Sequence, residues 1–195
     1  TAGYQVTCMD VQPAALETVG GKGLNLMRLA QAGMPVPPGF VVSTAAYQAF
    51  VNFNHLEDRL AAAFSSPAPG QPLADIAAAE TSTLIRAAFE GGAFPPELAA
   101  QIAEAYCEIG NHVPVAVRSS ATAEDLADAS FAGQQDTYLN IAGQAAVLNA
   151  VKRCFGSLWT ERAIVYRGRQ GITHEKVSLA VVVQQMVFAD AAGVV

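Results

Sequence analysis

The chain has 195 residues, of which 52% are hydrophobic and only 14% charged, and its formal net charge is −6. This composition is typical of a globular chain with a substantial core and argues against a disordered one. The acidic balance argues against a nucleic-acid partner, because binding a phosphate backbone requires clustered Lys and Arg.

The first 110 residues carry mostly helical patterns. Gly20-Gly21-Lys22-Gly23 opens a helix that Gly33 ends. Residues 40–42 read as a short strand, and Ser43 or Thr44 is placed to cap the next helix. Further Ala-rich helical patterns follow, one of which begins at Pro95-Pro96.

From residue 111 the pattern changes to strands. Residues 113–117 predict a short apolar strand that ends at Arg118, and a polar stretch of small residues runs from 119 to 135. Residues 136–141 predict a second strand, and residues 177–188 are the strongest strand candidate. The chain stops at residues 192–195 in what reads as the start of another strand, which favours truncation because an unfinished strand leaves backbone groups unpaired.

Gly20-Gly21-Lys22-Gly23 is a candidate anion site. Glycines let the backbone approach a ligand, and the N–H groups and dipole of a helix start favour negative charge, to which Lys22 adds a full positive charge. The spacing is not that of a Walker A loop. A glycine turn with a solvated lysine is the alternative interpretation.

Arg118 leaves the apolar strand into a hydroxyl-rich loop, Ser119-Ser120-Ala121-Thr122. The planar fork of donors on arginine suits phosphate oxygens, and ligands of α/β architectures commonly lie beyond the carboxyl ends of strands. The alternative is a structural arginine paired with Glu124 or Asp125.

Two later segments could also contact a ligand. Small residues around Gly133 suit a loop that lays N–H groups on phosphates, and Thr137 could add a hydroxyl; an ordinary surface turn is the alternative. Gln184 and Gln185 interrupt an apolar strand and need partners if buried, and alternation places only one of them on a given face. Either could instead be a locally satisfied glutamine.

The cysteines and histidines point to no metal or disulfide chemistry. The three cysteines are far apart, which predicts neither a disulfide framework nor a zinc site and makes a reducing cytoplasm the simplest setting. The histidines are isolated, with no ligand at metal spacing. The apolar run 177–183 is far shorter than the roughly 20 residues of a membrane helix, so no membrane association is expected.

Taken together, the motifs resemble the phosphoenolpyruvate-utilising dikinases, the family of phosphoenolpyruvate synthase, pyruvate phosphate dikinase and rifampicin phosphotransferase. The resemblance spans nearly the whole chain and is weakest over 52–112. Its segments are Val19 to Gly23, Val36 to Phe40, Val115 to Asp125, and Ser130 to Asn140.

The resemblance implies an α+β fold of the ATP-grasp type, with a helical lobe over 1–110, a sheet-containing lobe over 111–195, and a nucleotide site between them. By matching position, Lys22 and Arg118 would hold the ATP phosphates, and the Gly133 loop and Thr137 would cover them. The family's adenine-binding strand falls on four consecutive residues, Gln184, Gln185, Met186 and Val187.

The resemblance also implies that other parts of the enzyme lie outside this chain. In the family, ATP phosphorylates a histidine on a mobile domain, which then reaches an acceptor domain. The carboxylate ligands of Mg²⁺ are expected downstream, so the chain alone should not turn over. The whole enzyme is expected to be a phosphoenolpyruvate synthase, with rifampicin phosphotransferase as the close alternative. A non-catalytic nucleotide-binding or regulatory module is the rival from another class.

Overall fold

The computed structural model describes residues 6–9, 14–64, 75–121, 136–170 and 177–191. Its strands form one five-stranded antiparallel sheet in the order β1-β2-β5-β3-β4. The strands are β1 (Val6–Cys8), β2 (Gly39–Val42), β3 (Val115–Ala121), β4 (Thr137–Ile141) and β5 (Leu179–Gln185). The helices are α1 (Leu16–Gln31), α2 (Thr44–Phe53), α3 (Leu56–Phe64), α4 (Asp75–Gly91), α5 (Pro96–Ile109), α6 (Gln144–Ser157) and α7 (Glu161–Gln170).

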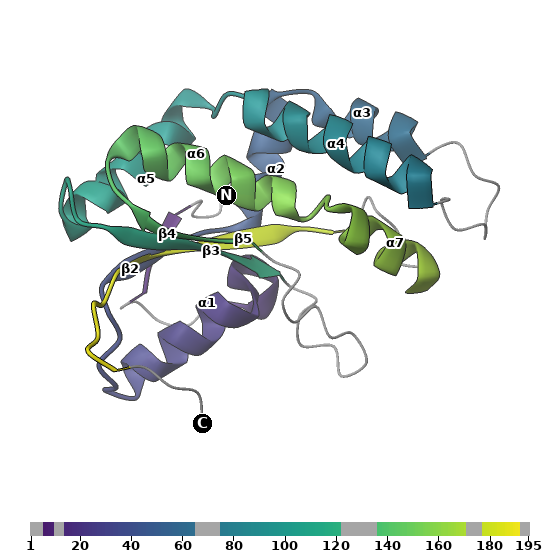
Figure 1. Ribbon diagram of the computed structural model, residues 1–195. Coiled ribbons are helices and arrows are strands. Elements are labelled where there is room, and N and C mark those ends of the chain that lie inside the picture. The colour runs from purple at the N-terminus through teal and green to yellow at the C-terminus, as the bar shows by residue number, and fades with distance from the viewer. Residues whose placement is uncertain (1–5, 10–13, 65–74, 122–135, 171–176, 192–195) are drawn as a thin grey trace.

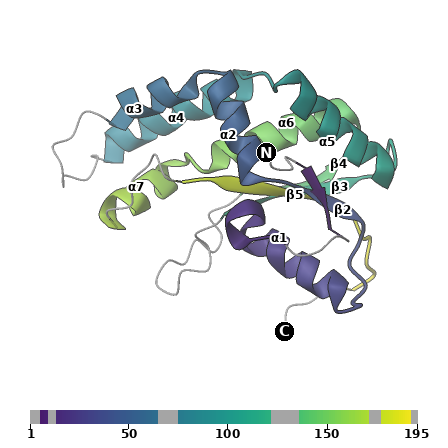
Figure 2. The same cartoon turned by 180° about the vertical axis from the view of Figure 1, so that it is seen from behind.

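The sheet separates two unequal helical layers. Helix α1 lies alone on one face, and helices α2 to α6 lie on the opposite face, as the views from both sides show (Figures 1 and 2). Because successive residues of a strand point to opposite faces, β5 contributes to both layers. Val181 and Val183 pack in the core beneath α2 to α6, whereas Ala180 and Val182 pack against α1.

The larger core is built on aromatic side chains. Tyr47 stacks on Phe89 with ring centroids 5.9 Å apart and meets the edge of Phe155 at 5.3 Å. The indole N–H of Trp159 donates a hydrogen bond to the Tyr47 hydroxyl over 3.0 Å, so the buried polar groups of both rings are paired. This core fixes the helical layer on the sheet.

Local sequence signals located several elements correctly. Strand β2 and helix α5 form where their patterns predicted them, and Ser43 caps α2 by accepting a hydrogen bond from the Ala46 N–H over 3.3 Å. The mixed α+β architecture is therefore confirmed.

No helix within the described ranges combines the length and apolarity needed to cross a bilayer. The three cysteines, all within those ranges, form no disulfide.

Two strands differ from the expectation. Strand β3 does not end at Arg118 but continues to Ala121, because residues 119–121 pair with residues 179–181 of β5 and the hydroxyls of Ser119 and Ser120 are hydrogen-bonded. Strand β1 lies in a stretch without a strand pattern. Strands β1 and β2 come from the first 110 residues and join the same sheet as β3 to β5.

Candidate functional site

The start of α1 is pressed against β3 at a glycine. Gly20 has φ 68° and ψ 174°, a non-helical conformation that interrupts α1, so that the regular helix runs on from Gly21. A Cβ at Gly20 would lie only 2.2 Å from the carbonyl oxygen of Ser120. Only glycine combines this backbone conformation with so close an approach. The segment Gly20-Gly21-Lys22-Gly23 is therefore held directly on the sheet.

Ser120 joins the two segments by hydrogen bonds. Its hydroxyl donates to the carbonyl oxygen of Val19 over 2.9 Å and accepts from the N–H of Gly23 over 3.2 Å. The Ser120 side chain is completely buried. One N–H of the helix start is thus occupied by a serine of β3, and the turn that carries Lys22 is fixed relative to that strand.

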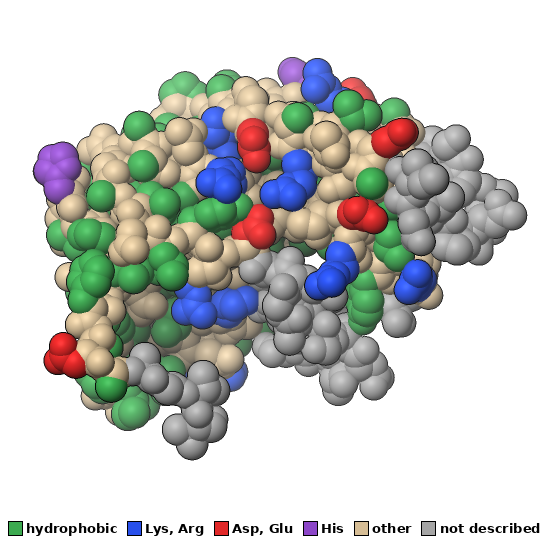
Figure 3. Space-filling model, in the orientation of Figure 1, with side chains coloured by type: hydrophobic (Ala, Val, Ile, Leu, Met, Phe, Trp, Pro, Cys, Tyr) green, Lys and Arg blue, Asp and Glu red, His purple; other side chains and the backbone are tan. Residues whose placement is uncertain are grey.

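Arg118 lies on the sheet face that α1 covers. It stands two residues before Ser120 on β3, and residues two apart on a strand share a face. The register agrees, since Arg118 pairs with Val182 and Val182 packs against α1. Lys22 and Arg118, both half-buried, are therefore contributed to the same side of the sheet by segments almost a hundred positions apart. Figure 3 shows Lys and Arg side chains at the surface between the sheet and α1.

Thr137 stands directly across from Arg118. The two residues are register partners on β3 and β4, so their side chains point to the same face, and Thr137 is exposed there. Gly133 lies outside the described residues. Of the residues predicted to contact phosphates, the structure thus places Lys22, Arg118 and Thr137 on one face.

The structure separates the two glutamines of β5. Gln184 pairs with Ala116 and shares the α1 face with Arg118, whereas Gln185 pairs with Val115 and lies on the opposite face. Gln184 is 8% exposed, and its side-chain amide donates to the Pro37 carbonyl oxygen over 3.3 Å. The sequence had left open which glutamine faces which side.

Met186 and Val187 follow the end of β5. The N–H of Met186 donates to the Pro114 carbonyl oxygen over 2.9 Å, which ties this segment to the residues before β3. Val187 and Phe188 are 63% and 74% exposed. Large apolar side chains are thus left uncovered where the sequence predicts adenine contacts, although an exposed apolar residue alone is common on protein surfaces.

Sequence reasoning missed a polar cluster behind Thr137. Asp136 accepts hydrogen bonds from the hydroxyl of Tyr138 over 2.7 Å and from the guanidinium of Arg86 over 3.5 Å. Burial, followed by this hydrogen bond and the negative charge of Asp136, raises the pKa of Tyr138, so its hydroxyl keeps its proton, and can donate, further into the alkaline range than an ordinary tyrosine. The sequence signal was weak, because Asp136 and Arg86 lie in separate elements.

The sequence of residues 16–195 matches a family described as "Pyruvate phosphate dikinase, AMP/ATP-binding domain". A probable phosphoenolpyruvate synthase of Methanocaldococcus jannaschii is 48% identical over 92% of the chain, and the phosphoenolpyruvate synthase of Pyrococcus furiosus is 42% identical over 90%. A rifampicin phosphotransferase of Streptomyces sviceus is 45% identical over 100%. The chain covers 15%, 26% and 22% of the lengths of these three proteins.

Proposed function

Because the chain belongs to the family of pyruvate phosphate dikinase AMP/ATP-binding domains, we propose that it binds ATP on the α1 face of its sheet. In this proposal the fold is of the ATP-grasp type, and the site lies along β3, β4 and the end of β5. The observation that carries the proposal is the attachment of the Lys22 turn to β3 through Ser120, two residues beyond Arg118.

Lys22, Arg118 and Thr137 supply the chemistry that a triphosphate needs. Arginine donates two parallel hydrogen bonds to phosphate oxygens, lysine adds a compact positive charge, and a threonine hydroxyl adds a neutral donor. Arg118 and Thr137 are already paired across two strands, so no backbone change is needed to present both. By resemblance to the family, the segment around Gly133 would cover the phosphates.

The adenine ring would lie at the end of β5. Gln184 shares the face of Arg118, and Met186 and Val187 follow β5, with the Val187 side chain exposed. An adenine ring is bound by apolar contact on its faces and hydrogen bonds at its edge. The N–H groups of Gln185 and Met186 already donate to the carbonyl oxygens of Pro38 and Pro114. Backbone groups of Val187 would therefore supply the edge contacts, and its side chain one apolar wall.

The proposed site also needs ligands for magnesium. Among the residues that the structure describes, no group of three His, Cys, Asp or Glu side chains is placed to hold a metal ion. ATP is bound by enzymes of this reaction class as its magnesium complex. By resemblance to the family, we propose that a later region of the whole protein supplies the carboxylate ligands of Mg²⁺.

For the whole protein, we propose a dikinase that uses ATP to phosphorylate a histidine on a separate domain, which then passes the phosphoryl group to an acceptor domain. Phosphoenolpyruvate synthase, with pyruvate as acceptor, is the first candidate, because two of the relatives carry that name. Rifampicin phosphotransferase is the second, because such a relative matches the entire chain at similar identity.

ATP binding is tested by titrating the full-length gene product with Mg-ATP. Lys22→Ala and Arg118→Ala should each weaken binding by about 10- to 100-fold, because each removes a charge-assisted contact. Arg59→Ala, an exposed arginine of α3 on the opposite side of the sheet, is the matched control and should leave affinity unchanged. Wild-type affinity in the Lys22→Ala, Arg118→Ala double variant would refute the site.

The acceptor is tested by measuring AMP formation by the full-length gene product with each candidate. A phosphoenolpyruvate synthase forms AMP when pyruvate is added, and a rifampicin phosphotransferase forms it when rifampicin is added. Tight ATP binding without AMP formation in either case would instead identify a non-catalytic nucleotide-binding module.

A further inference from the structure

Strand β4 is held to β3 by only a short ladder beside the proposed phosphate site. Near the site the ladder has two residue pairs, Arg118 with Thr137 and Val117 with Tyr138. Further along β4 the register shifts, and Ile141 pairs with Val115. Between these pairs β4 advances by one residue more than β3, and Asn140 has a left-handed φ of 58°, as expected of a bulge. The register beside Arg118 is therefore separated from the rest of the β3–β4 ladder.

A slip of one residue in this short ladder would move Thr137 to the other face of the sheet. The hydroxyl of Thr137 would then point away from Arg118, into the layer of α6. Two backbone pairs are a weak determinant of register, so other contacts must select the observed one.

Asp136 supplies those contacts from both its backbone and its side chain. Its carbonyl oxygen accepts hydrogen bonds from the N–H of Ser119 over 3.3 Å and from the Ser119 hydroxyl over 3.2 Å. Its carboxylate accepts from the Tyr138 hydroxyl over 2.7 Å and from the Arg86 guanidinium over 3.5 Å. One residue thus connects β3, β4 and α4 immediately before Thr137.

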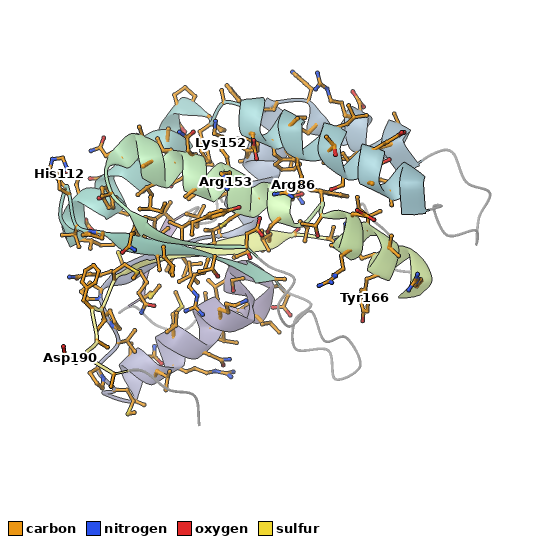
Figure 4. The ribbon with its side chains drawn as sticks, in the orientation of Figure 1. Arg86, His112, Lys152, Arg153, Tyr166 and Asp190 are labelled. Carbon is orange, nitrogen blue, oxygen red and sulfur yellow. The ribbon has the colours of Figure 1, made fainter. Side chains whose placement is uncertain are left out.

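A second layer of side chains supports Tyr138. The guanidinium of Arg153, on α6, lies 4.1 Å from the centre of the Tyr138 ring. Figure 4 shows Arg86, on α4, and Arg153, on α6, on the side of the sheet that α2 to α6 cover. Thus Tyr138 is held on the α6 side while its neighbour Thr137 is held on the α1 side.

We propose that Asp136 is a positioning residue for ATP, which acts by fixing the register that sets Thr137 beside Arg118. The inference rests on the proposed function, because it assumes that Arg118 and Thr137 contact the phosphates. Asp136 itself need not touch the nucleotide, since its carboxylate is engaged by Tyr138 and Arg86.

The proposal predicts a graded loss of Mg-ATP affinity in the full-length gene product. Asp136→Ala should weaken binding by about 10-fold, whereas Asp136→Asn, which keeps an acceptor for Tyr138, should weaken it by about 3-fold. Tyr138→Phe should resemble Asp136→Asn. Glu104→Gln, which removes an exposed carboxylate on α5, is the matched control and should bind ATP as the wild type does.

The decisive measurement is the double variant of Asp136→Ala with Thr137→Ala. A register slip moves Thr137 and leaves Arg118 on β3, so Asp136→Ala should cost less than about 2-fold once the Thr137 hydroxyl is absent. A purely structural role would give the same loss in both backgrounds, and that result would overturn the proposal. Unchanged ATP affinity in Asp136→Ala, with Arg118→Ala impaired, would overturn it as well. Unchanged affinity in Lys22→Ala and Arg118→Ala would instead refute the proposed function, and the inference with it.

Discussion

Substitution of Gly20 by alanine should be among the most destabilising single changes in the chain. The φ and ψ of this residue fall in a region almost exclusive to glycine, which costs another residue about 1–3 kcal/mol. The new Cβ would also lie 2.2 Å from the backbone oxygen of Ser120, so α1 must move away from β3. This movement would break the two buried hydrogen bonds of the Ser120 hydroxyl and add about 1–3 kcal/mol.

The expected total is about 2–6 kcal/mol, a large part of the roughly 5–15 kcal/mol that stabilises a folded domain. Gly33→Ala separates the two causes, because Gly33 also has a positive φ, 74°, but a Cβ there would meet no atom within 4 Å. That variant should lose only about 1–2 kcal/mol.

Urea unfolding followed by circular dichroism measures both variants against the wild type. The free energies of unfolding should differ by about 2 kcal/mol or more between Gly20→Ala and Gly33→Ala. Equal losses would refute the reasoning, because they would mean that α1 does not press on Ser120. In that case the argument that fixes Lys22 beside β3 would also fail.

Three further predictions concern the core and its edge. Tyr47→Phe should lose about 1–3 kcal/mol, because the buried indole N–H of Trp159 loses its acceptor. Burial raises the pKa of Tyr47 above the ordinary 10.0, so the folded state holds this proton more tightly. The free energy of unfolding should therefore fall more steeply with pH above 10.0 in the wild type than in Tyr47→Phe, by up to about 1.4 kcal/mol per pH unit, when urea unfolding is compared on both sides of that pH. Ser43→Ala should cost about 1 kcal/mol through loss of the α2 cap, measured in the same way. Phe188→Ser should change stability by less than about 0.5 kcal/mol, whereas Phe40→Ala should cost about 3–5 kcal/mol, and a similar loss for both would contradict their opposite burial.

The elements that local signals specify were predictable from the sequence. Ser43 stands at the start of α2 as a capping residue, and Pro95-Pro96 stand at the start of α5. Strand β3 was not delimited correctly, since Ser119 and Ser120 read as loop residues. Their partners, Asp136 and Val19, are distant in the chain, and no local pattern reports a hydrogen bond across that distance.

For the candidate site, the sequence suggested residue types but not their arrangement. The cationic candidates Lys22 and Arg118 could be named because glycine-rich and hydroxyl-rich motifs surround them. Only the strand register shows that both residues lie on the same side of the sheet. Sequence alternation alone does not fix this register, because a shift of one residue moves every side chain of a strand to the other face. The role of Asp136 depends on the bulge near Asn140, and a bulge has no reliable sequence signal when the residue is not glycine.

The order of the sheet has a consequence for how the chain is made. Strand β5 is the last of the five in the chain, yet it occupies the centre, between β2 and β3. During synthesis β2 and β3 must therefore leave the ribosome with their inner edges unsatisfied and wait for more than fifty further residues. Such edges pair readily with other chains. Nascent polypeptides shorter than the end of β5 should for this reason depend on chaperones, and release of the final strand should trigger cooperative closure of both cores at once.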